Sequence, residues 1–440
     1  MGALHWSLCL SLVGLAAAMA AQQPAGGSPA LVFEGARLIV GDGQPPIEDA
    51  AFVVEDARIT RVGPRAAVRR PPGATVVDLR GKTVIPTIID THSHLGYTNV
   101  ATARTAAAEY SRDNLIDHLH RYAYYGIAAT LSMGLDRDEV AYDLRARPPA
   151  GAARLLTAGP GLAMPNAGPF AAHWRDAAYG ITTVAEARSA VSELAGRKVD
   201  AIKIWVDDRN KTVTPLPPSL YVPIIEDAHA RGLKVIAHMY YLADAKALLR
   251  AGIDGFAHGV RDLEVDDEIL RLFKERPRVF VIPNLPDTPP AIGDLAWLSE
   301  TLPASQIEAL RGTAVAAPAR PRLFDIQARS LAKLSAAGVR IAMGTDAGVG
   351  APYGWAAHAE LADFVAAGLT PAQALTAATK TAAEVMGLAD LGTVTVGKSA
   401  DFIVLDGNPL DDIINTRRIA SVYLRGQAVD RAALTARWRR

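Results

Sequence analysis

The stretch Ile88-Ile89-Asp90-Thr91-His92-Ser93-His94 joins an apolar run to a His-X-His pair. A short apolar run of this kind is typical of a buried β-strand. Successive side chains of a strand point to opposite faces, so the imidazoles of His92 and His94 point the same way. Two imidazoles on one face of a strand end are suited to bind a metal ion. For this motif alone, a solvated strand end is an equally good interpretation.

Apolar runs like this one recur between Thr83 and about Leu388, where they alternate with helical segments. The alternation is typical of repeated βα units and a parallel sheet. Helices are expected at Val184–Leu194 and Ala243–Leu249, the second ending near Gly252. Eight strands indicate a closed (β/α)8 TIM barrel, whose active sites form at the C-terminal strand ends. The predicted strands are Ile88–His94, Ala128–Met133, Arg154–Ala158, Ala201–Val206, Lys234–His238, Gly255–His258, Val279–Pro283 and Arg340–Thr345.

Both ends of the chain predict further strands. Short alternating runs separated by Gly and Pro fill residues 30–83, and the same pattern returns in residues 388–430. Chain termini often lie close together, so we expect the two ends to pair in one small domain beside the barrel of residues 84–387. The predicted fold class is therefore α/β, a (β/α)8 TIM barrel with a small β-sandwich domain built from both chain ends.

Composition excludes several classes of protein. The chain has 440 residues, half of them apolar, which is ample for a buried core and excludes disorder. Lys and Arg together number 46, as do Asp and Glu, so no net charge attracts nucleic acid or an anionic membrane. The single cysteine, Cys9, excludes an intramolecular disulfide and a Cys-rich zinc site.

Residues 1–21 predict a signal peptide. An apolar run ends in Ala18-Met19-Ala20, the small residues that signal peptidase needs, although no Lys or Arg precedes the run. The run is shorter than the ~20 residues that a membrane-spanning helix needs. We therefore expect a secreted or periplasmic protein with no membrane contact after signal cleavage.

Lys203 lies inside the apolar strand predicted at Ala201–Val206. A lysine buried there must find a partner or lose its charge, because burying an unpaired ammonium is expensive. A neutral amine reacts with CO₂ to form a carbamate, which can bridge two cations. A salt-bridged lysine or a Schiff-base nucleophile is the alternative, and this strand alone favours it.

Three further residues complete the pattern of strand ends. His238 and His258 end two consecutive strands, and Asp346 follows the eighth. Each alone is more often a core histidine or a helix cap. Together with His92, His94 and Lys203 they all fall at predicted C-terminal strand ends, where barrel active sites form, and coincidence explains this poorly.

The complete pattern resembles the amidohydrolase superfamily with a binuclear metal centre. It is most similar to the branch related to imidazolonepropionase, which includes prolidase-like dipeptidases and ochratoxin-hydrolysing amidases. The resemblance covers almost the whole mature chain. It departs from the branch at Thr87, where a glycine is usual, and at Met239-Tyr240-Tyr241, where small residues are common. The residues that carry it are, in order, Gly81–Pro86, His92, His94, Lys203, His238, His258, Asp346 and the closing run Gly392–Leu405.

This resemblance implies a cofactor of two divalent metal ions, expected to be zinc. The implied ligands are His92, His94 and Asp346 for one metal and His238 and His258 for the other, with carboxylated Lys203 and a hydroxide as bridges. It also implies hydrolysis of an amide, in a peptide or an N-acyl amino acid, with Asp346 moving the proton. Tyr240 or Tyr241 is a candidate donor to the substrate carbonyl, with simple packing as the favoured alternative.

Several alternatives remain open at this level. A lactonase or phosphotriesterase would use the same centre, a Schiff-base lyase would need Lys203 and no metal, and a binding barrel would have no activity. The partner is a small-molecule substrate, and a homo-oligomer is possible because such barrels often pair. Arg209 or Arg261 is suited to pair with a substrate carboxylate, although surface arginines are more common.

Overall fold

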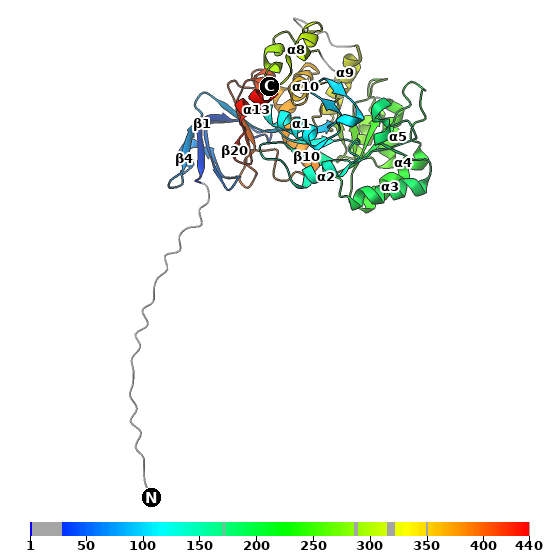
Figure 1. Cartoon of the computed structure of the whole chain (residues 1–440), viewed down its shortest axis with the longest axis horizontal. Helices are drawn as coiled ribbons and strands as arrows, with labels where there is room; N and C mark the ends of the chain where they lie inside the picture. The colour runs from blue at the N-terminus through cyan, green and yellow to red at the C-terminus, as the bar shows by residue number, and fades with distance from the viewer. Residues whose placement is uncertain (2–28, 170–171, 286–288, 315–321, 349–350, 440) are drawn as a thin grey trace.

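The computed structural model describes residues 1, 29–169, 172–285, 289–314, 322–348 and 351–439 (Figure 1). The predicted signal peptide, residues 1–21, lies outside the described residues apart from Met1. Among the helices of the described ranges, none combines the length and the apolar character needed to cross a membrane.

All eight strands predicted in the middle of the chain are present, and they lie in two parallel sheets. The first sheet has three strands, and the second has the other five with two short strands at its edge. Most strand bounds differ from prediction by one or two residues. The last strand ends earlier, at Ile341, because the following backbone turns to bond with the first strand. The strands are β6 (Ile88–Ser93), β9 (Ile127–Ser132) and β10 (Arg154–Thr157), then β11 (Leu162–Ala163), β12 (Tyr179–Gly180), β13 (Ile202–Val206), β14 (Val235–Met239), β15 (Gly255–Ala257), β16 (Phe280–Ile282) and β17 (Arg340–Ile341).

Backbone hydrogen bonds connect the two parallel sheets at both junctions. On one side the Thr91 N–H donates to the Met343 carbonyl at 3.0 Å, which places β6 beside the segment after β17. On the other side the Asp200 N–H donates to the Thr157 carbonyl at 2.8 Å, which places β10 beside the start of β13. The C-terminal ends of the eight strands therefore lie close together.

Helices connect successive strands, and both predicted helices are confirmed. The predicted segments correspond to α3 (Val184–Gly196) and α5 (Leu242–Ala251). A capping box of Thr183 and Glu186 starts α3, and Gly252 ends α5 with a φ of 97°. Figure 1 shows both helices on the outer side of the molecule with α4. The other α-helices are α1 (Arg112–Tyr124), α2 (Glu139–Ala146), α4 (Pro218–Ala230), α6 (Asp267–Glu275), α7 (Asp294–Leu298), α8 (Ala304–Arg311), α9 (Arg322–Ala336), α10 (Trp355–Ala366), α11 (Pro371–Thr376), α12 (Ala382–Met386) and α13 (Arg431–Trp438).

The two chain ends form one eight-stranded sheet, as expected from their alternating pattern. Strand β18 pairs antiparallel with β5 and so joins the end of the chain to its beginning. Phe33 stacks on Phe52 with ring centroids 4.9 Å apart, and Phe402 meets both rings edge-on. This aromatic cluster is the core of the sheet. Its strands are β1 (Leu31–Leu38), β2 (Ile47–Glu55), β3 (Arg58–Pro64), β4 (Thr75–Asp78), β5 (Thr83–Pro86), β18 (Phe402–Leu405), β19 (Ile419–Leu424) and β20 (Gln427–Ala428).

A buried histidine on α10 makes the fold sensitive to acid. His358 is 1% exposed; its Nε2 lies 2.8 Å from the Tyr125 carbonyl and its Nδ1 lies 3.1 Å from the Thr416 hydroxyl. Burial lowers its pKa to about 3. The unfolded chain binds a proton at this side chain below about pH 6.5, so between these values it binds more protons than the folded chain.

We expect the free energy of unfolding to fall as the pH falls from about 6.5 towards 3, with about 2 kcal/mol of the loss at pH 5 due to His358. Urea unfolding at both ends of this range measures it. The variant His358→Gln keeps a donor for the Tyr125 carbonyl but does not titrate. Its free energy of unfolding should therefore approach that of the parent protein as the pH falls. If the difference in the free energy of unfolding between the two proteins stays constant with pH, His358 is not the group that titrates.

Candidate active site

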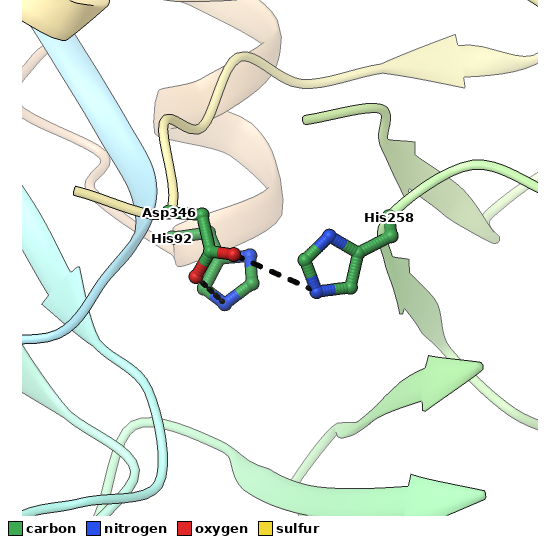
Figure 2. A group of neighbouring side chains, drawn as sticks. All are labelled: His92, His258 and Asp346. Carbon is green, nitrogen blue, oxygen red and sulfur yellow. Dashed lines mark ion pairs between the residues drawn. The ribbon is translucent and has the colours of Figure 1, made fainter. Parts of the chain in front are cut away.

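Four of the predicted residues meet at the C-terminal ends of β6, β15 and β17. His94 Nε2 lies 3.0 Å from Asp346 Oδ1, and His92 Nε2 lies 3.4 Å from the same oxygen. His258 Nε2 lies 4.0 Å from Asp346 Oδ2. Figure 2 shows the His258 ring extending from its own segment towards the carboxylate and His92. Residues separated by more than 250 positions in the sequence thus form one cluster.

The polar atoms of this cluster fit a metal ion. His92 Nε2 and Asp346 Oδ1 are buried and accept or donate no hydrogen bond among the described residues. Buried polar atoms almost always have a partner, and a cation provides one. Ligand atoms of His92, His258 and Asp346 lie within 4.8 Å of one another. Imidazole and carboxylate are ligands that zinc commonly takes, so these residues form a candidate metal site.

The charge states of these side chains suit metal binding. Burial lowers the pKa of His92 and His258 well below the usual value, so both imidazoles are neutral near pH 7. Burial raises the pKa of Asp346, but His92, His94 and Lys203 outweigh burial and hold this pKa below its usual value. Neutral imidazoles and an ionised carboxylate are the forms that bind a metal.

Left-handed backbone directs the side chain of His258 into the cluster. His238 pairs in register with Ala257, so these two residues face the same side of the sheet. Simple alternation would send His258 to the opposite side. Its φ of 86° breaks the alternation, and its ring lies 4.6 Å from that of His238. Asp346 also has a positive φ, 56°, and such strain of about 1–3 kcal/mol per residue tends to cluster at functional sites.

Asn284 and Asp90, to which the sequence analysis gave no role, hold the end of β6 in place. Asn284 Oδ1 lies 2.7 Å from His92 Nδ1, which fixes the proton on Nδ1 and leaves Nε2 free to bind a metal. Asp90 is fully buried and accepts hydrogen bonds from the backbone N–H groups of His92 and Thr345 and from the Thr345 hydroxyl. It therefore ties β6 to the segment that carries Asp346. Its position inside an apolar strand was the available signal.

His238 lies beside His258 but does not reach Asp346. Its Nε2 lies 3.2 Å from Asp207 Oδ2, an acceptor that the sequence did not identify. Because a carboxylate accepts, the proton of His238 is on Nε2 and Nδ1 is the atom left for a metal. Asp207 comes directly after β13, the strand that carries Lys203, and its other oxygen accepts from the Arg209 N–H.

We expect Asp207→Asn to weaken zinc binding about 10- to 100-fold, because a neutral amide does not raise the basicity of the His238 ring as a carboxylate does. Competition with a chelating dye measures the affinity. The chain offers a matched control in His229, whose Nε2 lies 2.8 Å from Asp254 Oδ2 on the outside of the fold. Asp254→Asn should leave zinc affinity unchanged, and equal affinities in all three proteins would rule out the role of Asp207.

Lys203 is 1% exposed on β13, which pairs with β14, the strand that carries His238. Its Nζ lies 3.2 Å from the sulfur of Met133 and 5.4 Å from the Trp205 ring centre, and no described carboxylate pairs with it. Burial lowers its pKa to about 7. Gly134 makes room for the side chain, because a Cβ there would lie 2.9 Å from Lys203 Cγ. The salt-bridged alternative thus has no partner in the described residues.

The two tyrosines after β14 differ in their contacts. The Tyr241 hydroxyl donates to Asp208 Oδ1 at 2.8 Å, which raises the pKa of Tyr241 to about 12. The Tyr240 ring meets the Tyr241 ring edge-on at 5.1 Å, and the Tyr240 carbonyl accepts from the Arg261 N–H. The hydroxyl proton of Tyr241 is therefore already hydrogen-bonded to a residue of the protein, Asp208.

Comparisons with known proteins identify the family of this chain. The model of the amidohydrolase family matches residues 83–429. Imidazolonepropionase of Deinococcus radiodurans is 28% identical over 86% of this chain and 92% of its own length. A prolidase candidate of Bifidobacterium longum is 26% identical with a TM-score of 0.72, covering 94% of this chain and all of that one. Ochratoxinase of A. niger shares the fold, with 23% identity and a TM-score of 0.70 over 91% of this chain and 95% of that one.

The family model spans every residue of the cluster, from the His-X-His strand to the aspartate after the eighth strand. This chain belongs to the amidohydrolase family and is a hydrolase that acts on carbon–nitrogen bonds.

Proposed function

We propose that this protein is a metal-dependent hydrolase that cleaves an amide bond in a peptide or an N-acyl amino acid. The observation that carries the proposal is the convergence of imidazole and carboxylate groups at the ends of parallel strands, with buried atoms of His92 and Asp346 that have no hydrogen bond among the described residues. The names imidazolonepropionase and prolidase among the similar proteins support hydrolysis of a carbon–nitrogen bond.

Two divalent metal ions, zinc above all, fit the residues of the site. His92, His94 and Asp346 would hold one ion, and His238 and His258 would hold the other. Lys203 would bridge them as a carbamate, which explains why this buried lysine has no carboxylate partner among the described residues. When bound, metal ions supply polarisation of the scissile carbonyl and a large drop in the pKa of water from ~15.7.

The residues of this chain supply the proton transfer. Asp346 stays ionised beside neutral imidazoles, so its carboxylate is ready to accept a proton from the attacking water. The same carboxyl group then donates that proton to the leaving amine, which restores the ionised state. The hydrogen bonds of Asp90 to the backbone of His92 and Thr345 hold the carboxylate at the strand end where the proton moves.

The wider architecture is part of this proposal. We infer that the two parallel sheets act as one closed (β/α)8 barrel, because hydrogen bonds connect them at both junctions. The terminal sheet would fold over its aromatic core as a β-sandwich. After removal of residues 1–21 the protein would act on a small molecule in the periplasm or outside the cell, without nucleic acid or membrane as a partner, as a monomer or a homo-oligomer.

A hydrolysis screen tests the proposed function. The mature, zinc-loaded protein is incubated with pooled dipeptides, N-acyl amino acids and lactones, with and without a chelator, and products are identified by mass spectrometry. Cleavage of an amide that the chelator abolishes is the expected result. Cleavage confined to lactones, or cleavage that resists the chelator, would overturn it.

A further inference from the structure

Trp205 lies on the same face of β13 as Lys203. The two residues are two positions apart, and alternate side chains of a strand share a face. Asp207, two positions further, contacts His238 Nε2 at 3.2 Å, so this face borders the candidate ligands. Trp205 itself pairs in register with His238 and is 4% exposed. Trp205 is therefore a buried aromatic residue of the site to which the proposed function gives no role.

Two glycines leave the space that the Trp205 ring and the Lys203 side chain occupy. A Cβ built on Gly134 would lie 2.6 Å from Trp205 Cη2 and 2.9 Å from Lys203 Cγ. A Cβ built on Gly161 would lie 2.7 Å from the same ring atom and 3.2 Å from the same Cγ. Carbon atoms in van der Waals contact are about 3.5–4.0 Å apart, so neither position accepts a side chain unless the ring moves. The tip of the indole and the stem of the lysine thus lie side by side against both glycines.

The backbone holds these two glycines together. The Gly161 N–H donates to the Gly134 carbonyl at 2.9 Å, which connects the segment after β9 to the segment after β10. Gly134 has a φ of 90°, in the left-handed region that favours glycine, and Gly161 lies outside that region. A side chain at position 134 would therefore strain the backbone as well as displace the ring. Gly161→Ala, in contrast, is a steric probe of the Trp205 ring alone.

The Lys203 side chain is enclosed on more than one side. Its Nζ lies over the Trp205 ring, 5.4 Å from the ring centre, and 3.2 Å from the sulfur of the fully buried Met133. A free lysine side chain has many rotamers, and it loses them when it is held in one geometry. Here the ring, the sulfur and the two glycines restrict the stem before any metal binds. This matters because a ligand group has to stay within about 0.5 Å of its productive position.

We propose that Trp205 is a positioning residue that orients Lys203 for carboxylation and for bridging two metal ions. The proposal rests on the proposed function, because it takes the bridge to be a carbamate. In the carboxylation, the neutral Nζ attacks the carbon of CO₂, one C=O electron pair moves onto oxygen, and the nitrogen releases one proton to water. The two oxygens of the new carboxylate then have to reach two ions. A stem that rotated freely would spread these oxygens over several positions, and the Trp205 ring prevents this.

The test observes the carbamate itself. Zinc-loaded protein is equilibrated with isotopically labelled bicarbonate, the carbamate carbon is followed by NMR, and bound zinc is counted by metal analysis. Lys203→Met identifies the signal, because it has no amine to carboxylate. We expect Trp205→Phe to raise the bicarbonate concentration that gives half of the signal by about 10- to 100-fold, the range for residues that support a ligand from outside the ligand set, and to lower the zinc content. Trp355→Phe changes an equally buried tryptophan on α10 and should leave both unchanged.

A double variant separates positioning from general stability. Gly161→Ala should lower the melting temperature, because the new methyl group meets the outer atoms of the Trp205 ring. Phenylalanine lacks these atoms, so the combination of Gly161→Ala with Trp205→Phe should recover a melting temperature close to that of Trp205→Phe, while the bicarbonate requirement stays high. If Trp205→Phe forms the carbamate at the bicarbonate concentration of the parent protein, or if the requirement only follows the melting temperature, Trp205 is a structural residue and the proposal fails.

These readouts do not depend on turnover. A raised bicarbonate requirement in Trp205→Phe supports the positioning role even if the hydrolysis screen finds no cleaved amide. If the parent protein shows no carbamate signal but cleaves an amide in a chelator-sensitive way, the positioning role is refuted together with the bridge, and the metal-dependent hydrolase still stands.

Discussion

Replacing Asp346 with asparagine is expected to lower kcat for amide hydrolysis by a factor of about 100 to 10,000, the range that a positioned proton-transfer group supplies. The amide of asparagine cannot accept a proton from water and return it to the leaving amine. Asparagine still offers an oxygen at the position of Asp346 Oδ1, which lies 3.0 Å from His94 and 3.4 Å from His92. Metal content should therefore fall far less than turnover.

The measurement pairs steady-state kinetics on the best substrate of the screen with metal analysis of the same samples. Asp254→Asn, a carboxylate that pairs with His229 on the outside of the fold, is the control for general effects of the exchange. Turnover close to that of the parent protein would remove Asp346 from the proton transfer. A loss of turnover that matches the loss of metal would show Asp346 to be a ligand only.

Much of the site could be predicted from the sequence because parallel strands carry their C-terminal ends to one side. His92, His94, His258 and Asp346 were predicted from strand ends alone, and the structure brings them together. The spacing of apolar runs also predicted all eight strands. Both predictions depend on local patterns, which a single sequence contains.

The features that could not be predicted depend on tertiary contacts. The φ of 86° at His258, which directs its ring into the cluster, has no marker such as glycine in the sequence. Asp207 and Asn284 determine which ring nitrogen of His238 and His92 carries the proton. In the sequence, neither residue can be told from an ordinary loop residue. Arg261 and Arg209 also looked alike. Among the described residues the side chain of Arg209 contacts the Ala167 carbonyl and that of Arg261 has no such contact, a difference that only the folded molecule shows.

Lys203→Ala is the second change for which we expect a large effect, the loss of at least one bound metal and most of the activity. The lysine is 1% exposed, has no described carboxylate partner and touches the sulfur of Met133 at 3.2 Å. A carbamate there would supply a bridging anion, and alanine supplies neither ligand nor charge. Removing one such contribution to a metal site costs about 10- to 100-fold in affinity or activity even for residues outside the ligand set, so a bridging ligand should cost more.

Added short carboxylic acids should restore part of the activity of Lys203→Ala. The shortened side chain leaves a space beside Gly134, and an acid such as propionate can place its carboxylate there. Lys203→Met is the matched control, since methionine fills the space and offers no carboxylate, and it should show the same loss without rescue. Lys234→Ala tests a half-buried lysine that donates to the Val385 carbonyl, and its metal content should match the parent protein.

The three lysine variants together separate a bridging carbamate from a buried ammonium. Methionine removes an unpaired charge from the interior, so Lys203→Met should unfold at a higher temperature than the parent protein when both are stripped of metal. With zinc bound, the order should reverse, because only the parent protein gains the stability that a bound metal adds. If Lys203→Met binds two metals and hydrolyses the substrate at the rate of the parent protein, the lysine is a structural residue and the carbamate is absent.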